Sequence, residues 1–145
     1  MNKRIKWKNI YYPSGALKYE GFAYFDSKLK ELIPTGQGVN YFENGNKHME
    51  GSFGKDWFIE TGTEYYKNGN IRFVGEYNKG PRAYYGPRYF VFGRLFKEAD
   101  ILWYEGTFLI RHSLIGYPMF EKEGSFKNGV EFKDDGTVKK EYRMI

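Results

Sequence analysis

A hairpin-sized unit recurs along this chain, and the repeat constrains the fold more than any other feature of the sequence. The segments 38–53, 62–77 and 129–142 align without gaps, and each places an aromatic residue four positions before a glycine. In the first two segments these glycines are Gly45 and Gly69, which stand 24 residues apart. A repeated unit of this length predicts a sheet that is built by stacking one supersecondary element on the next.

Each unit has the turn chemistry of a β-hairpin. Asn44-Gly45 and Asn68-Gly69 are strong two-residue turn signals, and Ser14-Gly15 and Asp135-Gly136 occupy the same place in their units. Because glycine reaches positive φ without a steric penalty, we expect positive φ at Gly45 and Gly69.

Extending the spacing of 24 residues from Gly69 leads to Gly93, which follows Tyr89 as Gly69 follows Tyr65. Gly93 is therefore predicted to be the next turn glycine. The predicted repeat has two insertions, one around Asp26–Pro34 and one between Gly93 and Gly106, over residues 94–105. The predicted units are 9–37, 38–61, 62–85, 86–115, 116–128 and 129–145.

A glycine-bulged turn sets the register that we expect inside each hairpin. In the third unit it places Thr63 opposite Phe73 on one face, and Glu64 opposite Arg72 on the other. A second set of glycines falls within the strands, where an aromatic ring of the adjoining unit is expected to cover the bare backbone. These glycines are Gly21, Gly51, Gly75, Gly106 and Gly124.

Composition agrees with strands and turns. Aromatic residues make up 21% of the chain and there are 18 glycines, and aromatic side chains favour pleated, half-buried surfaces. The predicted fold is all-β: an elongated antiparallel sheet of successive β-hairpin repeats, forming a single domain over residues 1–145.

The segments 36–45, 50–53, 65–69 and 75–77 resemble the MORN repeat family, and more closely its bacterial variant form. The resemblance covers the segment from Gly36 to Gly86 well and the rest of the chain partly. It implies a scaffold or binding role, with protein partners or phospholipid headgroups as ligands, and some variant members are antitoxins. No catalytic residue belongs to the repeat.

The residue types that carry most enzyme chemistry are scarce. The chain has no cysteine, and its histidines, His48 and His112, are far apart in the sequence. His48 is interpreted as a surface strand residue, and the carboxylates of Asp134 and Asp135 as turn chemistry. We therefore predict no enzymatic activity, no cofactor and no metal site.

The net charge of +5 is interpreted as a solvated surface, with an acidic partner as the alternative. The interleaved basic and aromatic residues after Lys79 favour a binding site, because Pro81 and Pro87 interrupt the strand there and Tyr and Arg are enriched at binding hot spots. The expected partner is a protein. The alternative is a glycan or an anionic phospholipid headgroup, self-association stays open, and nucleic acid is not expected because no recognised motif is found. No segment resembles a signal peptide, so a cytoplasmic location is expected. The candidate binding residues are Arg82, Tyr84, Tyr85, Arg88 and Tyr89.

Overall fold

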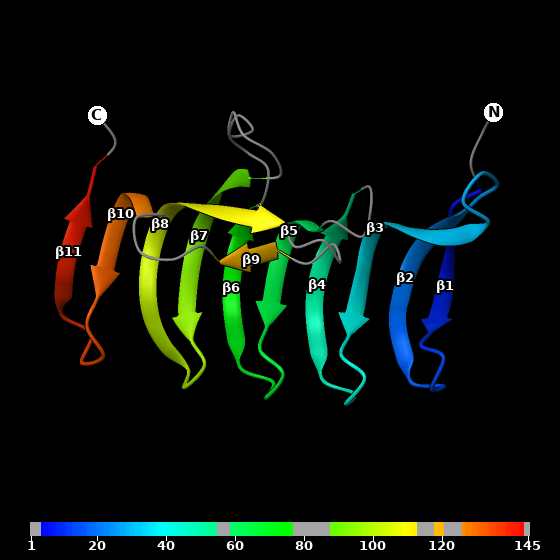
Figure 1. The fold of residues 1–145 in the computed structure, drawn as a ribbon, viewed down its shortest axis with the longest axis horizontal. Coiled ribbons are helices and arrows are strands. Elements are labelled where there is room, and N and C mark those ends of the chain that lie inside the picture. The colour runs from blue at the N-terminus through cyan, green and yellow to red at the C-terminus, as the bar shows by residue number, and fades with distance from the viewer. Residues whose placement is uncertain (1–3, 55–58, 77–87, 113–117, 121–125, 144–145) are drawn as a thin grey trace. The chain divides into compact units, whose positions relative to one another are not determined.

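The structure is a computed structural model of the chain. It describes residues 4–54, 59–76, 88–112, 118–120 and 126–143, with side chains for 4–54, 61–76, 92–108 and 128–143. Within these residues every regular element is a β-strand and every pairing is antiparallel, so the prediction of an all-β sheet of successive hairpins is confirmed (Figure 1).

Backbone contacts divide the chain into two compact units, residues 1–69 and residues 70–145. The single domain predicted over 1–145 stays a prediction. In the first unit the strands pair in chain order from β1 to β5. Their bounds are β1 Lys6–Tyr11, β2 Leu17–Asp26, β3 Glu31–Tyr41, β4 Lys47–Phe53 and β5 Ile59–Tyr65.

In the second unit the order is β6-β7-β8-β10-β11, and the short β9 pairs with the end of β8. The bounds are β6 Ile71–Glu76, β7 Arg88–Lys97, β8 Ile101–His112, β9 Pro118–Phe120, β10 Phe126–Phe132 and β11 Val138–Tyr142.

The turn glycines have the predicted backbone. Gly45 and Gly69 adopt φ of 93° and 95°, and Gly15 and Gly136 have similar values. In each of these turns the glycine N–H donates to the carbonyl three residues earlier, as Gly45 does to Phe42 at 3.0 Å. The Asn-Gly, Ser-Gly and Asp-Gly pairs therefore form the turns that their local chemistry predicts.

Gly93 is not a turn glycine, and that prediction was wrong. It lies inside β7, opposite Gly75 and Gly106, and the β7–β8 turn instead ends at Asp100, which has φ of 67°. Gly93 precedes Asp100 by the same interval that separates Gly38 from Gly45. Aspartate replaces glycine at this turn because it tolerates the left-handed region better than most residues.

The second predicted insertion is corrected with it. The β7–β8 hairpin has no extra residues over 94–105, and the lengthened connection is the one between β6 and β7. The first insertion lengthens the β2–β3 hairpin, in which Tyr24 pairs with Ile33 and Asp26 with Glu31. The aromatic residue four positions before the β7–β8 turn residue Asp100 is therefore Phe96 and not Tyr89.

The register inside the second hairpin follows the expected pattern next to the turn but shifts by one residue beyond it. The pairs predicted for the third hairpin, between β5 and β6, stay a prediction. In the second hairpin Tyr41 pairs with Lys47 but Asn40 pairs with Met49, so His48 is an extra residue on β4. This β-bulge turns the next residues to the opposite face. Across β4 and β5, which belong to neighbouring hairpins, Thr63 faces Glu50, whereas Glu64 faces Met49 and is buried.

The in-strand glycines form a row across each unit. In the first unit Gly21, Gly38, Gly51 and Gly62 pair in sequence, and in the second Gly75, Gly93, Gly106 and Gly129 do so. An aromatic ring covers Gly38, which is not among the glycines predicted to be covered: a Cβ there would lie within 2.6 Å of three atoms of Tyr19. At the predicted Gly51 and Gly106 the nearest atoms are backbone atoms of the next strand, and Gly124 lies outside the described residues. The row thus provides the space in which buried rings such as Tyr19 and Tyr104 lie.

Candidate functional site

Little of the predicted binding segment falls within the described residues. Arg82, Tyr84 and Tyr85 lie outside them. Arg88 and Tyr89 begin β7, where their backbones pair with Arg111 and Ile110 of β8, and their side chains lie outside the described set. The assignment of these five residues to a binding site therefore stays a prediction.

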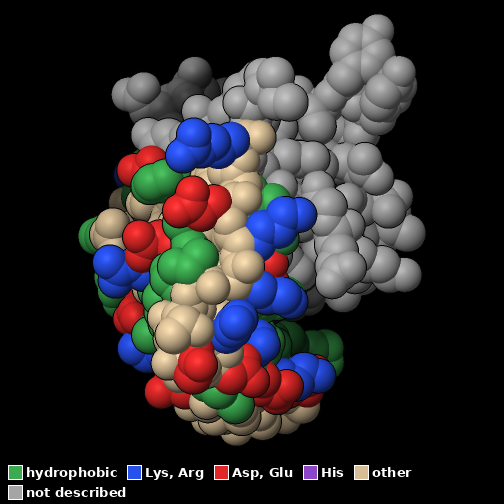
Figure 2. Space-filling view, turned by 90° about the vertical axis from the view of Figure 1, so that its left-hand side faces the viewer, with side chains coloured by type: hydrophobic (Ala, Val, Ile, Leu, Met, Phe, Trp, Pro, Cys, Tyr) green, Lys and Arg blue, Asp and Glu red, His purple; other side chains and the backbone are tan. Residues whose placement is uncertain are grey.

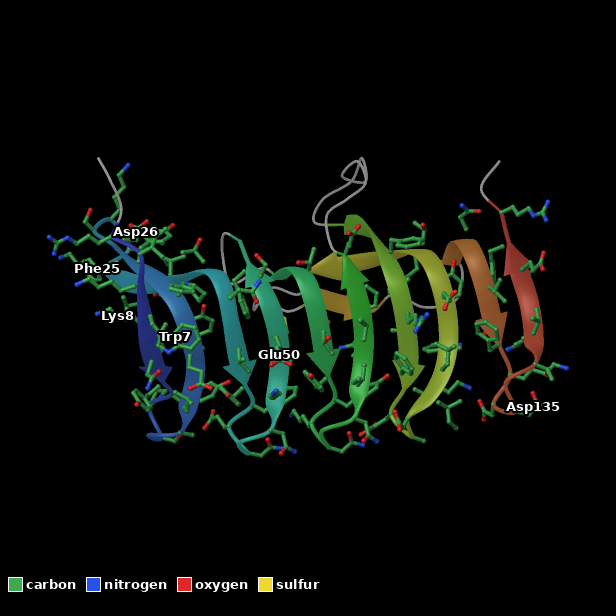
Figure 3. All side chains as sticks on the ribbon, turned by 180° about the vertical axis from the view of Figure 1, so that it is seen from behind. Trp7, Lys8, Phe25, Asp26, Glu50 and Asp135 are labelled. Atoms are coloured by element: carbon green, nitrogen blue, oxygen red, sulfur yellow. The ribbon has the colours of Figure 1, made fainter. Side chains whose placement is uncertain are left out.

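Carboxylates in the first unit link neighbouring hairpins. The Tyr41 hydroxyl donates to Oε1 of Glu20 at 2.6 Å, and the Tyr65 hydroxyl donates to Oε1 of Glu50 at 3.0 Å. Glu50 also accepts from Lys47 at 3.0 Å (Figure 3). These hydrogen bonds connect β2 to β3 and β4 to β5.

The Tyr–Glu contacts make stability depend on pH. Burial, followed by the hydrogen bonds and charge of the glutamates, raises the pKa of Tyr41 and Tyr65 to about 12 each. The protonated hydroxyls therefore contribute stability that is complete below about pH 10, the ordinary tyrosine pKa, and that is lost as the pH rises toward 12. We expect the double variant Tyr41→Phe with Tyr65→Phe to lose less free energy of unfolding between about pH 9 and pH 11 than the parent protein does.

Urea unfolding at a series of alkaline pH values measures this difference. Tyr11→Phe is the matched control, because its hydroxyl belongs to an exposed side chain with no carboxylate contact in the described residues. The assignment to Tyr41 and Tyr65 would be contradicted if the loss of unfolding free energy at alkaline pH were unchanged in the double variant but reduced in Tyr11→Phe.

A second carboxylate cluster, in the other unit, is also structural. The buried Glu131 accepts hydrogen bonds from Tyr142 at 2.6 Å and from the Trp103 indole at 3.1 Å, and Lys139 lies 3.5 Å away. Burial alone would raise the pKa of Glu131, but these hydrogen bonds and the lysine charge lower it below its usual value. Glu131 thus joins β8, β10 and β11 as a fully partnered anion.

Asp135 and His48, the other residues considered for a chemical role, also form contacts within the fold. Asp135 accepts from the backbone N–H and the hydroxyl of Thr137, at 2.9 and 2.6 Å, which confirms its role in the turn. His48 is not the surface residue that the sequence predicts: the bulge turns it inward, where it is buried and stacks on Phe42 with ring centroids 4.1 Å apart. In the part of the chain that the structure describes, no group of three or more potential ligands could hold a metal ion.

Exposed apolar side chains concentrate at the start of the first unit. Trp7 is 56% exposed, Phe22 40% and Phe25 60%, and Ile5, Tyr11 and Leu29 are similarly open. Trp7 and Phe22 pair across β1 and β2 and contact each other edge to face, with ring centroids 5.3 Å apart. We call five exposed residues of β1 and β2 the N-terminal surface, namely Lys6, Trp7, Lys8, Phe22 and Phe25. Figure 3 labels Trp7, Lys8 and Phe25.

The N-terminal surface carries positive charge that the fold does not neutralise. Lys6 and Lys8 are exposed, and neither forms an ion pair with any described residue. The same holds for Arg4 before β1, and for Lys28 and Lys30 at the tip of the β2–β3 hairpin.

The β11 edge of the second unit differs from the N-terminal surface. Lys139 lies beside Glu131 and Arg143 beside Glu141, whereas the ammonium group of Lys140 lies over the Tyr142 ring at 4.8 Å. Figure 2, which looks onto this side, shows acidic and basic side chains intermixed. Among the described residues, the largest group of exposed aromatic side chains therefore lies on β1 and β2.

The N-terminal surface is not among the sites predicted from the sequence. The signal for it is the alternation Lys6-Trp7-Lys8, which in a strand puts the tryptophan on one face and both lysines on the other. Its arrangement suits contact with an acidic ligand that also offers apolar groups.

No helix within the described residues is long and apolar enough to cross a membrane. Comparison of the chain with protein-family models, with curated proteins and with solved structures finds no match.

Proposed function

We propose that this protein is a non-catalytic interaction module that binds an acidic protein partner through the N-terminal surface. The observation that carries the proposal is that β1 carries unpaired lysines on one face and the exposed Trp7–Phe22 pair on the other. Tryptophan is among the residues that contribute most to protein interfaces, and a patch of exposed apolar groups marks an interaction site more often than a solvated surface.

Two further points support a binding role over an enzymatic one. The carboxylates Glu20, Glu50 and Glu131 are held by tyrosine, tryptophan or lysine side chains of neighbouring strands. The resemblance to the MORN repeat family, which stays a prediction, implies the same scaffold or binding role.

Site-specific photocrosslinking in producing cells tests the proposal. A benzophenone amino acid replaces Trp7 in one variant and Val138 in the other, because Val138 is exposed to a similar degree on the β11 edge. We expect position 7 to give a discrete protein adduct, and position 138 not to. The adduct is expected to disappear when Lys6→Glu and Lys8→Glu are added, since reversing both charges repels an acidic partner.

Two outcomes contradict the proposal. One is equal crosslinking from positions 7 and 138, which would mean nonspecific encounter. The other is an adduct at position 7 that contains only lipid, which would favour the anionic phospholipid alternative over a protein partner.

A further inference from the structure

The outer edge of β1 is open in the described structure. β1 pairs with β2 along one side, through the register from Lys6 opposite Ala23 to Tyr11 opposite Leu17, and no described strand pairs with its other side. An open edge exposes backbone N–H and C=O groups that can pair with another extended chain.

Natural proteins protect such edges against pairing with other chains. In this chain the side chains of β1 protect its edge less fully than those of β11 protect theirs. β11 exposes Val138 among residues that are almost all charged. β1 also carries lysines, which discourage pairing, but it exposes Trp7 and Tyr11 as well, and Ile5 directly before it. Large exposed apolar side chains work against edge protection, so β1 has the character of a binding edge.

The alternation of side chains along β1 specifies what an added strand would carry. Trp7 lies on the face where it meets Phe22, and Lys6 and Lys8 lie on the opposite face. Residues directly opposite each other in an antiparallel pair interact most strongly. The matching strand has apolar residues on the tryptophan face and acidic residues on the lysine face.

A second copy of this chain fits poorly as that strand. Pairing β1 with another β1 brings lysines toward lysines, and pairing it with β11 brings them toward Lys139 or Lys140. Like charges across a strand pair are destabilising, which disfavours self-association at this edge.

We propose that β1 binds an extended segment of alternating acidic and apolar residues by strand addition. The inference rests on the proposed function and adds the binding mode and the sequence pattern of the partner. Main-chain hydrogen bonds to the open edge hold the segment, and the lysines and the Trp7–Phe22 pair select its side chains.

The probe is a capped synthetic peptide of alternating glutamate and valine, about seven residues long, which is near the usual length of a strand. The control peptide has the same sequence with alternate amides N-methylated. It keeps the charge but lacks the N–H donors along one edge that strand pairing requires. We expect the unmodified peptide to bind at low salt and to slow hydrogen exchange at the β1 amides that point away from β2. The N-methylated peptide is expected to bind at least about tenfold more weakly, since it loses several hydrogen bonds.

Variants separate this edge from the rest of the molecule. Lys6→Glu with Lys8→Glu is expected to weaken peptide binding about tenfold, because two opposite-charge contacts become repulsive. The matched control, Lys139→Glu with Lys140→Glu on β11, is expected to leave binding unchanged. Thermal unfolding of each variant shows whether it folds as the parent does.

The outcomes distinguish the binding mode from the proposed function. Equal binding of both peptides would overturn strand addition while leaving an acidic partner in place. Absence of peptide binding together with a discrete protein adduct at position 7 would also overturn strand addition but not the proposed function. Binding of phosphatidylserine vesicles without binding of either peptide would overturn both.

Discussion

Replacing Gly51 by alanine is expected to lower the free energy of unfolding by about 2–6 kcal/mol, the sum of backbone strain and overpacking. Gly51 has φ of 150°, which disfavours a side chain, and a Cβ there would lie 2.1 Å from the Thr61 carbonyl oxygen and 2.7 Å from Gly62 Cα. These atoms belong to the backbone of β5, so β4 and β5 would have to move apart for the methyl group to fit. Urea unfolding followed by far-ultraviolet circular dichroism measures the loss.

Gly45→Ala is the control for this prediction. Gly45 has φ of 93°, and a Cβ there would meet no atom within 4 Å. Its substitution costs only the left-handed conformation, about 1–2 kcal/mol. Equal losses at the two positions would show that the glycine row is not needed for the close approach of the strands.

Truncating Tyr19 to alanine is expected to cost about 3–5 kcal/mol, as for other large buried side chains. Tyr19 is fully buried, its ring covers Gly38, and it meets Phe53 edge to face with ring centroids 5.2 Å apart. Its hydroxyl donates to the Phe22 carbonyl at 2.6 Å. The truncation therefore removes packing on two neighbouring strands and leaves a carbonyl without this donor.

Two substitutions bracket the Tyr19 result. Tyr19→Phe keeps the ring and loses the hydrogen bond, which is expected to cost about 1–2 kcal/mol. Phe25→Ala removes an exposed ring from the same strand, and is expected to change stability by less than about 0.5 kcal/mol. A loss for Tyr19→Phe as large as that for Tyr19→Ala would assign the stabilisation to the hydroxyl and not to the packed ring.

The Tyr19 ring and the glycine row show which roles of glycine the sequence pattern can predict and which it cannot. The sequence predicts that glycines inside strands mark the close approach of an aromatic ring, and Gly38 beneath Tyr19 shows such an approach, although Gly38 is not among the glycines predicted to be covered. It does not distinguish a turn glycine from a strand glycine at Gly93, because both follow an aromatic residue at a similar interval. Only the pairing of Gly93 with Gly75 and Gly106 separates the two roles.

The bulge at His48 shows a second limit. A single extra residue on β4 places His48 in the interior and shifts the pairing of β3 with β4 by one residue beyond the turn. Because side chains in a strand alternate, a one-residue shift changes every later assignment of face. No turn residue or hydrophobic alternation in this segment signals the shift.

The candidate binding surface depends on the tertiary structure even more strongly. Trp7 lies in an alternating segment that is compatible with a core strand, and what exposes it is the position of β1 at the edge of its unit. The lysines on its other face are available because no carboxylate of a neighbouring strand reaches them, and such pairing cannot be read from one segment.

The amino-acid sequence alone determined the all-β class, the hairpin repeat and the turns at Gly15, Gly45, Gly69 and Gly136, because these follow from the backbone preferences of a few adjacent residues. The tertiary structure alone decided the place of Gly93, the inward turn of His48 and the exposure of Trp7. Each of these depends on which strands become neighbours and in what register, and that choice is made by packing between segments that are distant in the sequence.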